Sequence, residues 1–212
     1  MGDEISKILN NMMENTIDEF MYEHNFKRRK NSLIYSRRIG TTKQKVKVVF
    51  FRHPSYHPGA IAHIYPWLYV CYPELNRIAY EMFKEANVEM ATVENAIRQP
   101  IQIYANAKRW MLMEDEKGTC LQDNIKEFLK THTIPLLDSL KSIEGFIELY
   151  EKKDKRVLMD DTFYVFIISA YVFRGEYRQA QDVLEKRFGK PGLRKRYTTA
   201  FEYLEDLMAG AY

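Results

Sequence analysis

The sequence predicts an α+β protein, in which an N-terminal helix and a small antiparallel sheet of three strands, or slightly more, precede a mostly helical C-terminal half. Three observations support this fold class. Apolar residues recur at helical spacing before residue 25, alternate between residues 32 and 72, and return to helical spacing from residue 119 onward. We expect a single compact domain, 1–212, with an α/β portion, 1–115, and a helical portion, 119–212.

The first expected element is an amphipathic helix over about residues 4–24. Its apolar residues recur at steps of three and four, from Ile5 to Met21. Asn25 suits the position just after this helix, because asparagine tolerates the left-handed backbone conformation that ends many helices.

Three extended runs follow and predict an antiparallel meander. Residues 32–39 and 44–52 both alternate, and GTTK at 40–43 has the composition of a turn between them. Residues 61–72 form the third run. Pro66 lies within it and predicts an edge strand or a bulge, because proline cannot donate to a sheet ladder.

The middle of the chain is less regular. A stripe of apolar residues predicts a helix from Leu75 that ends near Asn87. Residues 92–115 fit two interpretations. The first is a strand followed by a helix, of which we favour an extended piece at 100–104, and the second is a helix with Pro100 in its first turn.

From Thr119 onward the sequence predicts helices only. We expect the first to end before Pro135, because the residue before a proline disfavours the helical conformation. Ser142 has the chemistry of an N-cap for the next helix. The expected helices cover residues 121–131, 143–152, 161–174, 177–188 and 193–208.

Two of these helices, 161–174 and 177–188, resemble one tetratricopeptide hairpin. Gly175 permits a tight turn between them, and the small side chain of Ala180 lets them approach closely. A solenoid needs about three repeats, and the sequence contains no second copy. We therefore expect one helical hairpin within a mixed domain.

The distribution of charge is the clearest functional signal. No Asp or Glu lies between His24 and Pro73, whereas ten Lys and Arg residues do. That basic segment carries +10 within a chain of net charge +3, so the remainder carries −7. A block of one sign predicts a positive face that attracts a negatively charged partner.

We expect this face to bind a protein partner or a second copy of the chain, and a nucleic acid is the alternative. In the alternative, aromatic rings interleaved with the cations would stack on bases. The candidate binding residues are Lys27, Arg28, Arg29, Lys30, Tyr35, Arg37, Arg38, Lys45, Lys47, Arg52 and Trp67.

Three of the five histidines, His53, His57 and His63, fall within 21 residues, which raises the possibility of a metal site. HPSYHPG at 53–59 has the residues of a loop instead, with two prolines and a glycine. No acidic residue lies within ten positions of His57. We expect a loop, no metal and no cofactor.

Catalytic signatures are absent from the sequence. There is no phosphate-binding loop, dinucleotide fingerprint, HExxH or GxSxG motif. Cys71 and Cys120 are expected to be buried thiols rather than nucleophiles. The sequence thus leaves open whether the protein is an enzyme, favours a binding protein and indicates no catalytic residue.

Two further patterns concern the compartment. The N-terminal segment carries acidic residues and has no uninterrupted apolar stretch typical of a signal peptide. The longest apolar run, 163–172, is about half the length that spans a bilayer. We expect a cytoplasmic protein without a membrane partner.

The segment EHNFKRRKNSLIYSRRI resembles the opening of a bacterial family of unknown function, in which a helix leads into Gly-Phe-basic-basic and an aromatic-bearing strand. Asn25 stands where that family has glycine, and the resemblance covers about residues 12–72. Members are often encoded beside polymorphic toxins. The resemblance implies an immunity or anti-phage accessory protein that occludes its partner without catalysis.

Overall fold

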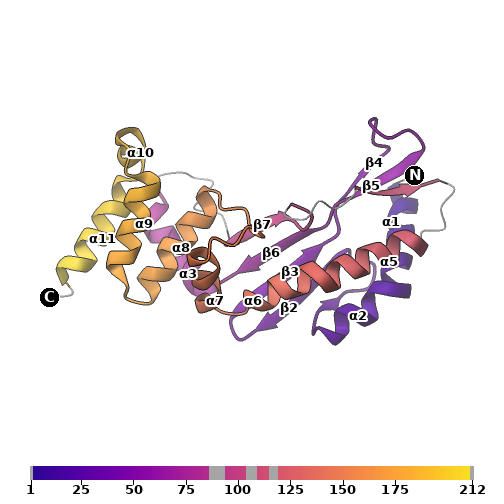
Figure 1. The fold of residues 1–212 in the computed structure, drawn as a ribbon, viewed down its shortest axis with the longest axis horizontal. Helices are drawn as coiled ribbons and strands as arrows, with labels where there is room; N and C mark the ends of the chain where they lie inside the picture. Colours follow the sequence, from indigo (N-terminus) through magenta and orange to yellow (C-terminus); the bar gives the residue numbers. More distant parts are fainter. Residues whose placement is uncertain (1, 86–93, 104–108, 115–118, 211–212) are drawn as a thin grey trace. The chain divides into compact units, whose positions relative to one another are not determined.

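The structure is a computed structural model that describes residues 2–85, 94–103, 109–114 and 119–210 (Figure 1). It has the expected α+β composition, with an N-terminal helix, antiparallel sheets and a mostly helical C-terminal half. The chain divides into two compact units built from interleaved segments. The first unit is Met1–Ile39, Lys43–Val70 and Arg98–Ser139, and the second is Gly40–Thr42, Cys71–Ile97 and Leu140–Tyr212.

The first unit begins with the expected N-terminal helix. It is continuous through α1 (Gly2–Met12), a π-helical turn (Met13–Ile17) and α2 (Asp18–Glu23). Asn25 follows with φ of 64°, as predicted for a left-handed residue after the helix. The amide of Phe26 then donates to the carbonyl of Met21, which turns the chain toward the sheet.

Five strands form the larger sheet, in the order β1-β2-β3-β6-β7. Strands β2 and β3 form a hairpin around Gly40, whose φ of 56° suits a tight turn. In this hairpin buried and exposed residues alternate, as the sequence predicts. The bounds are β1 (Lys27–Arg28), β2 (Ile34–Ile39), β3 (Thr42–Lys47), β6 (Trp67–Cys71) and β7 (Ile97–Pro100).

Three further strands form a smaller antiparallel sheet in the order β4-β5-β8. They are β4 (Phe50–Arg52), β5 (Ala60–Ile64) and β8 (Trp110–Met113). Phe51 lies opposite His63, and His63 lies opposite Met111. These three side chains therefore share one face of the smaller sheet.

The interpretation of Pro66 as an edge or bulge residue is wrong. Pro66 lies in the break between β5 and β6, and β6 has neighbours on both sides, β3 and β7. The missing amide of proline is tolerated because the chain passes there from one sheet to the other. The Pro66 carbonyl still accepts a hydrogen bond from the Ile101 amide, at 2.9 Å.

The region around Pro100 also differs from the expectation. The extended piece is β7 (Ile97–Pro100) rather than 100–104, and residues 101–103 form a turn. Residue 104 lies outside the described ranges. Strand β8 was not predicted, because WMLM has no alternation of polar and apolar residues that would reveal a strand.

The helix expected to end before Pro135 continues past it. Thr119–Phe128 (α5) leads through a π-helical turn (Leu129–Thr133) into α6 (Ile134–Ser139). A π-helical turn shifts the hydrogen-bond register by one residue, which can accommodate a proline near the start of the next turn. At its C-terminal end this helical run contacts the β2–β3 hairpin, because Asp138 and the Leu137 carbonyl accept hydrogen bonds from Arg37 and Gln44 (Figure 1).

The second unit is helical and centres on α8 (Asp161–Phe173), which packs against α3, α7 and α9. Gly175, with φ of 75°, forms the turn into α9, and Ala180 is fully buried. The predicted hairpin is therefore confirmed. The other helices are α3 (Pro73–Phe83), α7 (Ile143–Glu151), α9 (Tyr177–Phe188), α10 (Pro191–Arg196) and α11 (Thr198–Gly210).

One local prediction in the second unit is also confirmed. Ser142 caps α7, since its hydroxyl accepts a hydrogen bond from the Gly145 amide at 3.2 Å. Asp160 caps α8 in the same way, from the Phe163 amide. Within the described ranges, no helix combines the length and hydropathy that a membrane crossing requires.

Candidate anion-binding face

The cations of the basic segment separate into a buried and an exposed group. Arg28 and Arg37 are buried, with side chains that are only 2% and 4% exposed. The lysines of β3 are exposed instead. The two groups have different roles, and only the exposed group can contact a partner.

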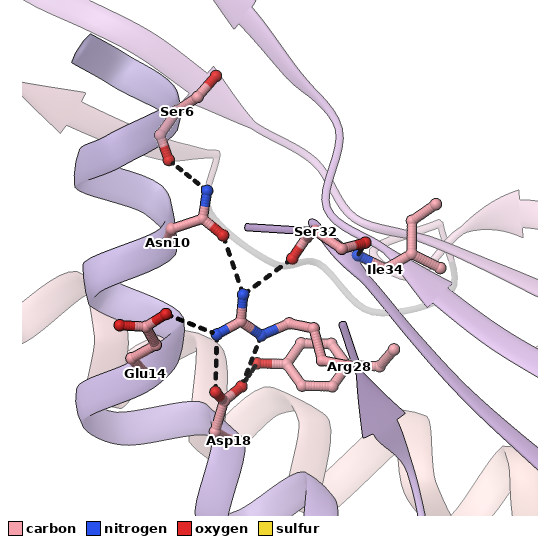
Figure 2. Close-up of polar contacts among 8 residues, drawn as sticks. Ser6, Asn10, Glu14, Asp18, Arg28, Ser32 and Ile34 are labelled. Atoms are coloured by element: carbon pink, nitrogen blue, oxygen red, sulfur yellow. Dashed lines mark hydrogen bonds and ion pairs between the residues drawn. The ribbon is translucent and has the colours of Figure 1, made fainter. Parts of the chain in front are cut away.

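Arg28, on β1, forms the centre of a buried polar network that connects the N-terminal helix to β1 and β2 (Figure 2). Its guanidinium donates to both carboxylate oxygens of Asp18, at 2.8 and 2.7 Å. It also donates to Asn10 Oδ1 and to the Ser32 carbonyl, each at 2.9 Å. Tyr35 completes the network by donating its hydroxyl to Asp18.

This network shifts two pKa values in opposite directions. Burial alone would raise the pKa of Asp18, but the hydrogen bonds from Arg28 and Tyr35 and the charge of Arg28 outweigh it and lower that pKa. Burial, together with the hydrogen bond to Asp18, raises the pKa of the Tyr35 hydroxyl far above its usual range. Asp18 therefore stays ionised and Tyr35 stays protonated.

Arg37, on β2, connects the β2–β3 hairpin to α6 and to the end of α2 in the same manner. Its guanidinium donates to Gln44 Oε1 at 2.8 Å, to the His24 carbonyl at 3.1 Å and to Asp138 Oδ1 at 2.7 Å. The Gln44 amide in turn donates to the Leu137 carbonyl. Arg28, Tyr35 and Arg37 were predicted to bind a partner, and the structure places them inside the first unit.

The opposite face of the β2–β3 hairpin is basic and exposed. Lys43, Lys45 and Lys47, here called the lysine row, occupy every second position of β3. No carboxylate of the described residues lies within 4 Å of their amino groups. Two-residue spacing along a strand separates them by about 6.7 Å.

A hollow of about 710 Å³ opens beside this hairpin. Lys27 lies on β1 opposite Ser36, and both contribute to its lining. The full lining is Tyr22, Asn25, Phe26, Lys27, Ser36, Arg37, Arg38, Lys43, Gln44 and Lys45. Four of these ten residues are exposed cations, whereas Arg37 is buried and paired with Asp138. None of the ten is acidic, so the hollow suits an anionic group.

Aromatic side chains accompany the cations on the neighbouring strand. Trp67 and Tyr69, both half-buried on β6, have ring centroids 6.5 Å apart in a nearly parallel arrangement. The guanidinium of Arg98, on β7, lies 5.4 Å from the Trp67 ring centroid. Because β6 lies between β3 and β7, this cation–aromatic group borders the lysine row.

A second group of rings lies on the smaller sheet. We define the aromatic cluster as Phe51, Tyr56, His63 and Tyr65. The Phe51 and Tyr65 rings are stacked, with centroids 4.5 Å apart and planes 10° apart. The Tyr56 hydroxyl lies 2.5 Å from His63 Nδ1, and the Arg109 guanidinium lies 4.9 Å from the Tyr56 ring centroid.

The predicted loop that contains two of the histidines is confirmed, and His63 lies outside it on β5. His53 has a φ of 41° at the end of β4, and His57 is exposed in the loop. Burial and the charge of Arg109 lower the pKa of His63. Among the residues that the structure describes, no group of three or more His, Cys, Asp or Glu side chains could hold a metal.

The remaining predicted residues lie in several places. Arg29 and Lys30 are exposed in the turn between β1 and β2. Arg52 lies opposite the buried Ala62, so it points away from the face that carries Phe51. Cys71 is buried as expected, whereas Cys120 is exposed, which contradicts the prediction for that thiol.

Two cations next to aromatic rings, Arg98 and Arg109, were not predicted. Both lie outside the basic segment, on β7 and just before β8. Only the pairing of distant strands brings them next to Trp67 and Tyr56. Lys43 belongs to the basic segment and could have been chosen from the alternation of β3.

No protein-family model, curated protein or solved structure matches this chain. The resemblance of residues 12–72 to an immunity-like family therefore stays a prediction. The chemical capacity of the site follows from its side chains alone. Ammonium groups at regular spacing and exposed ring faces can bind an extended anion that also carries planar groups.

Proposed function

We propose that the protein is a nucleic-acid-binding protein and that the lysine row is its phosphate-binding element. The observation that carries the proposal is the regular exposure of Lys43, Lys45 and Lys47, whose amino groups have no carboxylate of the described residues within 4 Å. Their spacing of about 6.7 Å is comparable to the separation of successive phosphates on an extended strand. Each lysine can therefore contact its own phosphate.

Residue composition favours this partner over a protein. Lysine is depleted in the buried parts of protein interfaces, whereas lysines that neutralise phosphates supply most of the affinity for nucleic acids. Trp67 and Tyr69 on the adjacent strand add ring faces, and Arg98 adds a further exposed cation. Cations bordered by aromatic side chains are typical of surfaces that bind single strands.

The salt dependence of binding tests the proposal. Fluorescence anisotropy with fluorescein-labelled dT20 and rU20 is measured between 50 and 200 mM NaCl, concentrations of the order used for such slopes. We expect the triple variant Lys43→Ala, Lys45→Ala, Lys47→Ala to bind more weakly. The slope of log K against log salt should fall in magnitude by about two, since each phosphate contact contributes about 0.7.

A matched control comes from the second unit. Lys186, Lys190 and Lys195 are also exposed, and no carboxylate of the described residues pairs with them. Their triple replacement by alanine removes the same charge from the chain and should leave the slope unchanged. The proposal fails if the wild-type protein binds neither oligonucleotide, or if both triple variants lose affinity equally.

The hollow favours a second candidate, a cytoplasmic binding protein of the immunity or anti-phage accessory kind with an acidic protein partner. A concave, cationic surface can receive a carboxylate-bearing segment, and desolvation there strengthens the attraction. Ser36→Trp fills the hollow without removing a charge. This candidate predicts a stoichiometric acidic protein that copurifies with the wild type and is lost from Ser36→Trp, and recovery of none would count against it.

A further inference from the structure

We propose that Phe51 is a stacking platform for an unpaired base, so that the protein prefers single strands to duplexes. This inference rests on the proposed function and adds the form of nucleic acid that is bound. Residue Phe51 is 54% exposed although one of its ring faces is stacked on Tyr65. Its other ring face is thus available to a partner.

Neighbouring rings hold the Phe51 side chain in its exposed position. Tyr65 supports the inner ring face at a centroid distance of 4.5 Å, and the ring of His63 lies 6.4 Å away. Cross-strand pairing of Phe51 with His63 fixes the backbone beneath them. A rigid ring that is already oriented loses little conformational entropy when a base stacks on it.

Phe51 also lies close to the lysine row along the chain. The Tyr65 amide donates to the Val49 carbonyl at 2.9 Å, so the pairing of β4 with β5 extends to residue 49, two residues after Lys47. Four residues of extended chain span at most about 13–14 Å. Phe51 therefore lies within about 14 Å of Lys47, a distance that two nucleotides of an extended strand can bridge.

The preference for single strands follows from base geometry. In a duplex both faces of each internal base are covered by neighbouring bases, and stacking on a protein ring would require unpairing. An unpaired base has a free face that can contact Phe51 directly. Duplexes can still contact the lysine row through their phosphates, because that attraction does not depend on the bases.

The test compares single and double strands of equal length with exposed-ring variants. Affinities of the 212-residue chain for fluorescein-labelled dT20 and for the corresponding 20-base-pair duplex are measured by anisotropy. Phe51→Ala removes the ring, and Phe51→Leu keeps an apolar side chain without a ring face. Phe173→Ala is the matched control, since Phe173 is 49% exposed on α8 in the second unit.

We expect both Phe51 variants to weaken dT20 binding by about 5- to 150-fold, the range for loss of one base–aromatic stack. Binding of the duplex should change less than twofold, and Phe173→Ala should change neither affinity. Phe51→Ala and Phe51→Leu should also unfold at about the wild-type temperature, because the ring is exposed.

Three results would overturn the inference in distinguishable ways. If both Phe51 variants bind dT20 like the wild type while the lysine-row variant is weakened, the stacking is wrong and the proposed function stands. If Phe51→Leu binds like the wild type and Phe51→Ala does not, the contact is apolar rather than a stack. If the wild type binds neither oligonucleotide, both proposals fall together.

Discussion

Single residues decide which cations of the basic segment can contact a partner. Arg28 has its charge matched by Asp18, and Arg37 has its charge matched by Asp138. Removing one partner of a buried ion pair destabilises a protein by more than the pair as a whole stabilises it, because the remaining charge stays buried without an opposite charge. These arginines are therefore expected to affect stability rather than binding.

Replacement of Asp18 tests the structural role of the Arg28 network. Asp18→Ala should lower the free energy of unfolding by about 3 kcal/mol, the lower end of the range for a broken buried ion pair, because the buried Arg28 would keep only the half-exposed Glu14 carboxylate at 3.6 Å. Glu148→Gln is a control, since its ion pair with Lys152 is 61–69% exposed. That change should cost less than about 0.5 kcal/mol. Urea unfolding measures both, and equal effects would contradict the prediction.

The same network predicts a loss of stability in acid. The pKa of Asp18 is lower in the folded protein than its ordinary value of 3.8. The stabilisation is therefore complete above about pH 5 and is lost as the pH falls through the folded-state pKa. In Asp18→Asn, the unfolding free energy should depend less steeply on pH between about 5 and 2. An unchanged slope in urea titrations would show that other carboxylates dominate.

His63 offers a second test at this scale. The nearby charge of Arg109 disfavours the protonated imidazole, so Arg109→Gln should raise the pKa of His63. Burial remains, and the pKa should stay below 6.5. An NMR titration of the five histidines measures this shift, with His63→Gln for assignment. Arg98→Gln, on the other sheet, should leave the titration of His63 unchanged.

Secondary-structure elements position the two candidate surfaces. Strand β3 presents the lysine row because its other side chains, Thr42, Gln44 and Val46, are buried. The break at Pro66 divides residues 60–71 into β5, which belongs to the smaller sheet, and β6, which belongs to the larger sheet. Strand β6 therefore borders the lysine row, and β5 carries His63. The lysine row and the aromatic cluster both belong to the first unit.

At the level of the helical hairpin, Gly175 permits the turn between α8 and α9. A Cβ placed there would meet no atom within 4 Å, so Gly175→Ala changes only the backbone preference at a φ of +75°. We expect a loss of about 1–2 kcal/mol in the free energy of unfolding. Thermal and urea unfolding of the purified variant measure this loss.

Gly192 provides the matched control for this prediction. It lies in α10, a Cβ there would also meet no atom within 4 Å, and its backbone conformation is one that alanine adopts. Gly192→Ala should therefore be neutral or stabilise by up to about 1 kcal/mol. Similar losses in the two variants would show that the left-handed conformation of Gly175 is not the cause.

On the scale of the whole molecule, the interleaving of the two units predicts how the chain can be divided. Helix α3 belongs to the second unit, and its buried residues pack against α8, although 77 residues separate Phe83 from Asp161. A fragment of residues 1–141 would leave the apolar face of α3 uncovered. We expect that fragment to bind a hydrophobic dye, because exposed apolar surface binds such dyes.

Co-expression of residues 142–212 with that fragment is the complementary experiment. The cut lies just before Ser142, which caps α7, so both fragments keep their helices intact. Packing of α3 against α8 should then restore a soluble complex with a cooperative transition. A fragment 1–141 that binds no hydrophobic dye would show that α3 does not need α8.

Local patterns in the sequence are sufficient for the fold class and for many element boundaries. Apolar spacing predicts the N-terminal helix, the β2–β3 hairpin and the α8–α9 hairpin, because these elements depend on contacts between residues close in the chain. Capping by Ser142 and the left-handed Asn25 are local for the same reason. The basic segment is likewise a property of the sequence alone.

Only the tertiary structure decides which of those cations are exposed. Whether Arg28 or Lys45 contacts solvent depends on strand register and on helices distant in sequence, such as α6 with Asp138. The π-helical turn before Pro135 and the placing of Arg98 beside Trp67 also depend on long-range packing. Charge and periodicity can be read from the local sequence, whereas burial depends on how the whole chain folds. Burial determines whether a charged side chain stabilises the fold or is available to a partner.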